Sequence, residues 1–270
     1  MQNKTTLPKW LDSLIFNKLG AKYCRSNSDM TVIDWDKGDV LNYLGTYFPR
    51  SYAEAYCIFS DYFQHHPSEF ATQTEISIFD FGCGTGGEII GLLNAIDEHL
   101  PRIGNVRIVA LDGNHHALRL YERILKETQF NFEVENNSAS IMIDDFYDLH
   151  ILNNVLSKHF DIIISFKAIC EFVTKDQFEQ QNAYEHIAKF LLPKLTDNGL
   201  LLLEDVTTYN NTTQEWLPKM LDKGLMKAKC SVISKNEGYN QTYCITHSHC
   251  RNDKSKVAWR MIKREINMKN

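Results

Sequence analysis

The sequence predicts an α/β fold with a mostly parallel sheet, and three features carry this prediction. Short apolar runs alternate with segments of helical periodicity from Glu75 onward. Runs such as 160–166 and 199–206 are almost continuously apolar, which is typical of parallel strands buried on both faces. A glycine cluster directly follows the first run, where a strand would turn into a helix. With 43% hydrophobic and 23% charged residues over 270 positions, the chain has globular rather than disordered composition.

Helical periodicity opens the chain. Residues 8–23 form one such segment, and 37–65 form a second, with apolar side chains recurring every three or four positions. Pro49 lacks an amide hydrogen, so we expect it to divide the second segment into two helices. We expect residues 1–74 to form an N-terminal helical cap and residues 75–270 to form the main domain.

Strands and helices then alternate. The expected strands are 76–81, 106–112, 160–166 and 199–206, with a further one at either 130–134 or 140–144, and the expected helices are 87–99, 115–127 and 175–195. Residues 228–234 and 257–263 form two more apolar runs, separated by 22 mostly polar residues without a helical pattern. A parallel pair needs a crossover segment, so these two strands should pair antiparallel at one edge.

The charge balance differs sharply along the chain. Residues 219–270 hold twelve Lys and Arg against four Asp and Glu, a balance of +8 within a total of -5. The basic residues from 219 to 264 could form a footprint for RNA or a ribosomal component, or an ordinary solvated face. No apolar stretch approaches the roughly 18 residues of a membrane helix. The N-terminus lacks an apolar signal core, so we expect a cytoplasmic protein, with a mitochondrial presequence as the alternative.

Seven cysteines at irregular spacing predict reduced thiols rather than a disulfide framework. Three of them gather with two histidines near the C-terminus: Cys230, Cys244, His247, His249 and Cys250. Thiolates and imidazoles suit zinc or an iron–sulfur cluster, but this spacing matches no standard metal motif. We expect no metal here.

The strongest motif is I-F-D-F-G-C-G-T-G-G-E, residues 78–88. Glycines at 82 and 84 permit a tight turn and a close backbone approach, and Gly86 lets the following helix begin against the strand. Exposed amides at the start of that helix favour an anionic or polar ligand. Asp80 precedes the glycines and suits a cationic amino group.

A second motif, V-A-L-D-G-N, ends the next strand at Asp112. This aspartate lies 26 residues after Gly86, where a carboxylate can bind both ribose hydroxyls of a nucleoside. It could instead cap the following helix, but Asn114 is better placed for that role.

Together these motifs resemble those of class I S-adenosylmethionine-dependent methyltransferases, over roughly residues 75–265. The resemblance implies a Rossmann-like fold with seven strands, the last one antiparallel, and S-adenosyl-L-methionine as cofactor. It places Asp80 near the methionine amino group, Gly82, Cys83 and Gly84 along the methionine and ribose, and Asp112 on the ribose. It also implies adenine contacts from Gly113 and Asn114 and from an acid before Phe146, for which Asp144 and Asp145 both fit and we choose Asp145. Phe146 could stack on the adenine or belong to the core. Ser165, Phe166 and Lys167 are placed where methyl group and acceptor meet.

An NAD-dependent dehydrogenase is the rival interpretation. Its G-x-G-x-x-G pattern is met by Gly82, Gly84 and Gly87, so the glycines do not decide between the two. Asp80 favours S-adenosylmethionine, and no dehydrogenase acid–base pair is recognisable.

The acceptor is less clearly indicated. The S-F-K-A sequence at 165–168 differs from the N-P-P-Y pattern of enzymes that methylate exocyclic base amines. Local patterns at 47–56, 165–172 and 204–208 resemble the small-ribosomal-subunit methyltransferase-like family, which implies RNA or a ribosome-associated substrate. The alternatives are a small-molecule or peptide methyltransferase with the helical cap as lid, and a non-catalytic cofactor-binding assembly factor.

Four further residues are candidates for the site. If the N-terminal helices cover the cofactor, Arg50 could pair with the methionine carboxylate and Tyr52 could line the methyl-transfer site, although their spacing suits core packing equally well. Lys167 and Glu171 could orient the acceptor or remove a proton, or could form a salt bridge four residues apart.

Overall fold

The computed structural model describes residues 3–25, 36–143, 146–156, 159–173, 182–211 and 213–263. The chain forms two compact units. The first contains residues 1–75, 83–141 and 242–255, and the second contains 76–82, 142–241 and 256–270. These units group residues 1–75 with 83–141, and the expected cap at 1–74 and main domain at 75–270 stay a prediction.

The first unit combines two parallel strand pairs with long helices. Its elements are β1 (Lys4–Thr6), α1 (Lys9–Asp12), the π-helix Ser13–Lys18, α2 (Lys37–His65), α3 (Gly87–His99), β3 (Asn105–Asp112), α4 (His115–Glu127), β4 (Glu133–Ser140) and most of β10 (Gln241–His247). Strand β3 pairs with β4 in parallel over its whole length, and β1 pairs with β10 in parallel. Helices α3 and α4 have the predicted bounds, whereas β4 lies between the two alternatives given for the third strand.

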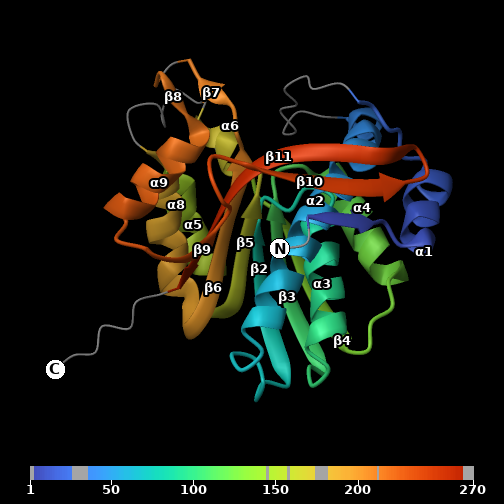
Figure 1. Cartoon of the computed structure of the whole chain (residues 1–270), viewed down its shortest axis with the longest axis horizontal. Coiled ribbons are helices and arrows are strands. Elements are labelled where there is room, and N and C mark those ends of the chain that lie inside the picture. Colours follow the sequence, from blue (N-terminus) through green and yellow to red (C-terminus); the bar gives the residue numbers. More distant parts are fainter. Residues whose placement is uncertain are drawn as a thin grey trace. The chain divides into compact units, whose positions relative to one another are not determined.

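The prediction that Pro49 would divide the second helical segment is wrong. Helix α2 runs unbroken from Lys37 to His65 with Pro49 inside it (Figure 1). A proline costs the helix one hydrogen bond to the carbonyl four residues earlier, here that of Gly45. Most residues from Leu44 to Phe63 are buried, and this packing outweighs one missing bond.

Small residues let α2 lie close to α3. A Cβ atom on Gly87 would approach the Phe48 carbonyl oxygen to 2.5 Å, and one on Gly91 would overlap the Tyr52 carbonyl oxygen. The start of α3 is therefore held directly against the middle of α2.

The second unit has a parallel core with antiparallel strands beside it. Its elements are β2 (Glu75–Phe81), α5 (Phe146–Val155), β5 (Phe160–Phe166), α6 (Ile169–Val173), α8 (Ala183–Leu191), the 3₁₀ turn Leu192–Lys194, β6 (Leu195–Val206), β7 (Tyr209–Asn210), β8 (Glu215–Trp216), α9 (Leu217–Lys227), β9 (Ser231–Lys235) and the end of β11 (Cys250–Lys263). Strand β5 pairs in parallel with both β2 and β6. Their inward residues are almost all fully buried, which confirms the interpretation of continuous apolar runs as central strands.

The C-terminal strands pair antiparallel, as predicted. Strand β11 pairs antiparallel with β6 along Val257–Lys263 and with β9 on its other side. Strands β1 and β10 were not expected and exceed the seven strands of the prediction. The mixed α/β architecture itself is confirmed.

Two further expectations concern the helices of the chain. Of the predicted helix 175–195, residues 175–181 lie outside them, and α8 covers Ala183–Leu191. No helix in the described ranges combines the length and apolar character that crossing a bilayer needs.

Candidate functional site

The glycine motif forms a tight loop whose geometry demands glycine at two positions. In the first unit, the Cys83 amide donates to the Leu111 carbonyl at 2.9 Å, and the Gly86 amide donates to the Cys83 carbonyl at 2.7 Å. Gly84 and Gly86 have φ angles of 50° and 77°, in the left-handed region. A Cβ atom on Gly86 would also collide with the buried ring of Tyr121.

Asp112 fastens this loop to the end of β3. Its Oδ2 accepts a hydrogen bond from the Gly84 amide and its Oδ1 accepts one from the Asn114 amide, both at 2.7 Å. Burial raises the pKa of Asp112, and the two amide hydrogen bonds oppose that effect. Each carboxylate oxygen has a second lone pair, so Asp112 can accept further hydroxyl donors.

Asn114 caps the next helix. Its Oδ1 accepts hydrogen bonds from the His116 and Ala117 amides at 2.9 and 3.1 Å, which confirms that Asn114 and not Asp112 is the N-cap of α4. The carboxamide oxygen is therefore already used. Gly113 links the two residues and is half-buried.

One more polar group belongs to the loop. The Thr85 hydroxyl is buried and has no hydrogen-bond partner among the described residues. A buried hydroxyl without a partner is costly, so a ligand group that bonded to it would relieve that cost.

In the second unit, the predicted residues gather at the carboxyl ends of β2 and β5. Asp80 is fully buried on β2, in register with Ile164 of β5. Gly82 has a φ of 82° and packs so closely on Ala168 that a Cβ would overlap that side chain. The Ser165 hydroxyl donates to the Phe81 carbonyl at 2.9 Å and is buried, so Ser165 ties the two strands together.

Lys167 adopts an unusual conformation just after β5. Its φ is 55°, and its amide donates to the Glu204 carbonyl at 3.0 Å. Its ammonium lies 3.8 Å from the Glu204 carboxylate, which is fully buried. Strained non-glycine residues concentrate at functional sites. Because Lys167 precedes α6 rather than lying in it, the spacing of a helical ion pair with Glu171 does not apply to it.

A buried polar cluster that the sequence analysis did not select lies next to Glu204. Tyr184 donates to Asp205 Oδ2 at 2.9 Å, and the Val206 amide donates to Asp205 Oδ1 at 2.8 Å. Burial raises the pKa of Asp205 to about 6, although hydrogen bonds from Cys170, Val206 and Tyr184 act in the opposite direction. The E-D pair at the end of an apolar strand was the signal that could have found it.

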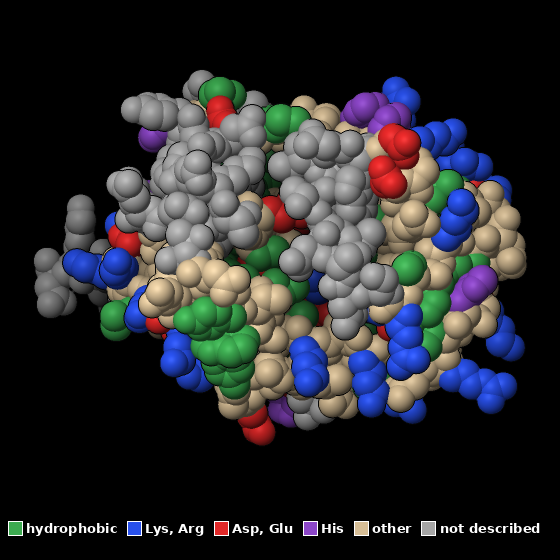
Figure 2. Space-filling model, turned by 90° about the horizontal axis from the view of Figure 1, so that it is seen from above, with side chains coloured by type: hydrophobic (Ala, Val, Ile, Leu, Met, Phe, Trp, Pro, Cys, Tyr) green, Lys and Arg blue, Asp and Glu red, His purple; other side chains and the backbone are tan. Residues whose placement is uncertain are grey.

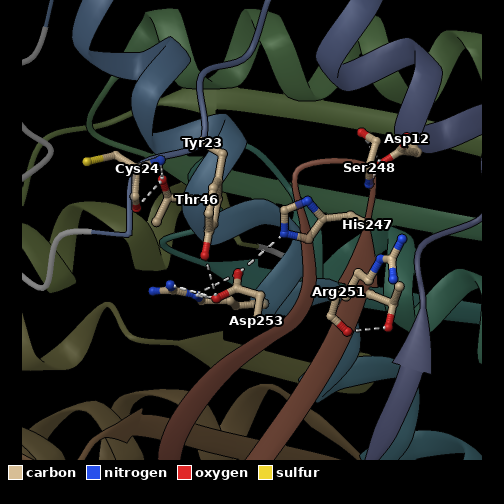
Figure 3. Close-up of polar contacts among 10 residues, drawn as sticks. Asp12, Tyr23, Cys24, Thr46, His247, Ser248, Arg251 and Asp253 are labelled. Atoms are coloured by element: carbon tan, nitrogen blue, oxygen red, sulfur yellow. Dashed lines mark hydrogen bonds and ion pairs between the residues drawn. The ribbon is translucent and has the colours of Figure 1, made fainter.

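Arg50 pairs with a carboxylate of the chain itself, and its suggested contact with the methionine carboxylate stays a prediction. Its Nε donates to Asp253 Oδ1 and Oδ2 at 3.1 and 3.0 Å, and its Nη2 donates to Oδ1 at 2.8 Å. Tyr23 donates to Oδ1 at 3.2 Å, and His247 Nε2 lies 3.6 Å from Oδ2 (Figure 3). Burial favours a higher pKa for Asp253, but His247 and Arg50 outweigh it, and the pKa is lowered.

Tyr52 follows the packing alternative. Its ring stacks on Tyr56 at 5.9 Å, and its hydroxyl accepts a hydrogen bond from the Asn94 amide group of α3 at 3.2 Å. It is buried between α2 and α3. Tyr52 therefore serves the contact between these helices, and its suggested place beside a methyl-transfer site stays a prediction.

The C-terminal cysteines and histidines have other contacts. His247 and His249 both pack on the ring of Phe16. Within the described ranges, no three His, Cys, Asp or Glu side chains are arranged to hold a metal ion. All seven cysteines are free thiols.

The side chains of two residues predicted to contact adenine are outside what the structure describes. Asp145 lies outside the described residues, and Phe146 begins α5 without a described side chain. Their proposed roles stay predictions.

The chain belongs to the methyltransferase domain family, which it matches over residues 73–261. The family match identifies the chain as a methyltransferase. No curated protein sequence matches it closely enough to count as a relative.

Solved structures resemble the chain at low identity. One is an S-adenosylmethionine-dependent methyltransferase from Clostridium acetobutylicum, 11% identical, with a TM-score of 0.44, covering 77% of this chain and 91% of the other. A candidate RNA methyltransferase from Pyrococcus horikoshii is 12% identical, with a TM-score of 0.47 and coverages of 97% and 100%. The mitomycin 7-O-methyltransferase MmcR is 13% identical, with a TM-score of 0.47 and coverages of 84% and 56%. These likenesses are too distant to identify the acceptor.

Proposed function

We propose that the loop at Cys83–Gly86, fastened by Asp112, binds S-adenosylmethionine and that the enzyme transfers the methyl group to RNA. The observation that carries the cofactor site is the pair of 2.7 Å hydrogen bonds from the Gly84 and Asn114 amides to Asp112. They hold a carboxylate with spare acceptor capacity beside the glycine turn.

The residues of this loop suit the cofactor. Asp112 would accept the ribose hydroxyls, and the Thr85 hydroxyl would offer a further polar contact. Gly113 would lie beside the adenine, while Asn114 would contribute only its backbone there because its side chain caps α4. We also propose that Gly82 and Asp80, which precede the loop in the sequence, contact the cofactor. The Asp80 carboxylate would attract the methionine amino group.

Bound S-adenosylmethionine supplies a methyl group activated by the sulfonium, so the protein mainly needs to align the acceptor and exclude water. We propose that Lys167 aligns the acceptor. Its ammonium is paired with Glu204 and can orient the acceptor, but an ammonium group is already protonated and cannot act as a base. Glu171, in the first turn of α6, remains the proposed proton acceptor where one is needed.

Exposed aromatic side chains support an RNA acceptor. Tyr209, Trp216 and Tyr239 are 44%, 42% and 39% exposed and touch edge to face, with ring centroids 5.2 and 5.8 Å apart. Exposed lysines occur on α9, which follows Trp216 directly: Lys219, Lys223 and Lys227. Figure 2 shows exposed apolar side chains near Lys and Arg side chains on the face viewed. Aromatic rings next to lysines are what single-stranded RNA requires for stacking and phosphate contacts.

Fewer basic side chains are available to bind RNA than the number of Lys and Arg residues between 219 and 264 suggests. Arg260 is buried and forms a two-pronged ion pair with Asp222 at 2.6 and 2.9 Å. Lys223 pairs with Glu215 at 2.6 Å, and Lys227 pairs with Glu185 at 3.9 Å. We therefore place RNA contacts on the aromatic side chains and on the exposed Lys219 of α9.

Calorimetric titration tests the cofactor site. Wild-type protein should bind S-adenosylhomocysteine at micromolar concentrations and should not bind NAD. Asp112→Ala should lose most of that affinity, whereas Glu135→Gln, which changes an exposed carboxylate on β4, should keep it. Thermal unfolding of both variants separates lost binding from lost folding. Unchanged affinity in folded Asp112→Ala would remove the ribose assignment.

The acceptor is tested by methyl transfer from labelled cofactor to total RNA and to a panel of small molecules and peptides. RNA labelling, with affinity that falls steeply as salt rises, supports the proposal because phosphate contacts release counterions. Labelling of small molecules alone would favour the alternative, and cofactor binding without turnover on any acceptor would favour an assembly factor.

We also propose a cytoplasmic location. The seven free cysteines support it, because reducing compartments keep thiols unpaired. Microscopy of a tagged chain tests this proposal, and a signal confined to mitochondria would contradict it.

A further inference from the structure

A second polar pocket lies in the first unit, apart from the glycine loop. Arg25, Arg50, Asn252, Asp253 and Lys254 line a hollow of about 270 Å³. Arg25 and Lys254 are exposed, and neither forms an ion pair with any described residue. Arg50 is buried to 9% exposure and forms the floor.

The pocket has more positive than negative charge available to a ligand. Its one carboxylate, on Asp253, is already engaged by three groups: the Arg50 guanidinium, the Tyr23 hydroxyl and His247. Two arginines and a lysine face this single acid, so the lining carries an excess of two positive charges before His247 is counted. The Asn252 side chain adds hydrogen-bond donors.

Arg50 retains donors for a ligand. Its Nε and Nη2 bond to Asp253, whereas Nη1 takes no part in these hydrogen bonds to Asp253. A guanidinium fixed by a buried carboxylate loses little side-chain entropy on binding a further anion. Phosphate sites typically contain arginine and lysine side chains, with the guanidinium held in a fixed orientation.

Helix α2 connects this pocket to the glycine loop. A Cβ atom on Gly84 would lie 3.0 Å from the Tyr43 hydroxyl, so Tyr43 covers the loop. Tyr43 stacks on Tyr47 with centroids 5.0 Å apart, and the Arg50 guanidinium lies 5.7 Å from the centre of the Tyr47 ring. Both tyrosines are half-buried. One helix face thus carries a loop contact, two stacked rings and a guanidinium in order.

We propose that this pocket binds a phosphate group of the acceptor, with the Tyr43–Tyr47 pair packing against the part of the acceptor between that phosphate and the methyl group. This inference rests on the proposed methyl transfer to RNA. The pocket would accept either of two anionic groups, a phosphate of the acceptor or the carboxylate of the cofactor. The experiment must therefore distinguish these two ligands.

The test titrates inorganic phosphate into protein saturated with S-adenosylhomocysteine, and repeats the titration with a ten-nucleotide oligouridylate. Both probes should bind the saturated protein. Lys254→Ala and Arg25→Ala should each weaken both probes about tenfold, because each removes one charge-assisted contact. Arg251→Ala is the matched control: it removes the same charge from the same strand, but Figure 3 shows the Arg251 side chain turned away from Asp253.

Each outcome decides the inference. Selective weakening in the two pocket variants supports it. Equal weakening in Arg251→Ala, or no phosphate binding at all, would overturn it. Phosphate that binds only the free protein and is displaced by S-adenosylhomocysteine would assign the pocket to the cofactor carboxylate instead. Protein that binds phosphate but not S-adenosylhomocysteine would refute the proposed function, and the acceptor role with it.

Discussion

Replacing Asp205 by asparagine removes a carboxyl group that resists ionisation. Burial raises its pKa from 3.8 to about 6 in the folded protein. The folded chain therefore keeps this proton over a pH range in which the unfolded chain has released it. At 1.36 kcal/mol for each pH unit, the interval from 3.8 to about 6 corresponds to about 3 kcal/mol.

The sign follows from proton binding. Below pH 3.8 both states hold the proton, and the group's contribution to stability is fully present. As pH rises through about 6, the wild type loses this contribution, whereas Asp205→Asn has none to lose. The variant's free energy of unfolding, relative to wild type, should rise by about 3 kcal/mol between pH 4 and pH 7 and stay level above that.

Urea unfolding followed by tryptophan fluorescence measures this difference at each pH. Asp197→Asn, an exposed change on the same strand β6, controls for simple loss of a carboxylate and should stay within about 0.5 kcal/mol of wild type. If the Asp205→Asn difference stays level from pH 4 to pH 7, the argument from burial is refuted.

Three other substitutions have expected outcomes. Arg50→Met should lower the free energy of unfolding by about 3–5 kcal/mol in urea titrations, because it leaves Asp253 buried without its main partner; a loss under 1 kcal/mol would contradict this. Gly86→Ala should cost about 3 kcal/mol by the same measurement, since it combines a φ of 77° with a collision with Tyr121; near-wild-type stability would be the opposing result. Trp216→Ala should weaken oligouridylate binding by about 1–3 kcal/mol in fluorescence anisotropy and leave S-adenosylhomocysteine binding unchanged; unaltered RNA affinity would exclude stacking at Trp216.

Local patterns predicted most of the fold because the decisive forces act over a few residues. The helices at 87–99 and 115–127 and the strand at 160–166 have the predicted bounds. Each has a strong period or a continuous apolar run, and two of them begin next to a glycine or an asparagine cap. The glycines of the loop were predictable for the same reason.

Tertiary packing decided what the sequence could not. Pro49 stays inside a helix because packing around it outweighs one missing bond. Strands β1 and β10 pair across more than 230 positions, which no local pattern reveals.

Candidate site residues fall into the same two groups. The ribose role of Asp112 stays a prediction, whereas Asn114 was predictable as the N-cap of α4 because it acts on neighbouring backbone amides. Arg50 was not, since its partner Asp253 is 203 positions away. The cluster around Asp205 was missed because its partner Tyr184 comes from α8, which carries no recognisable polar motif.

The two hydrogen bonds on Asp112 bear on how a ligand would be received. A loop that is fastened before binding has already lost its conformational freedom during folding. Association then needs little reordering of the backbone, so the Gly84 amide should exchange slowly with solvent even in the free protein. Affinity would be governed by contacts with the ligand rather than by closure of the loop, and the rate of association should depend little on loop motion.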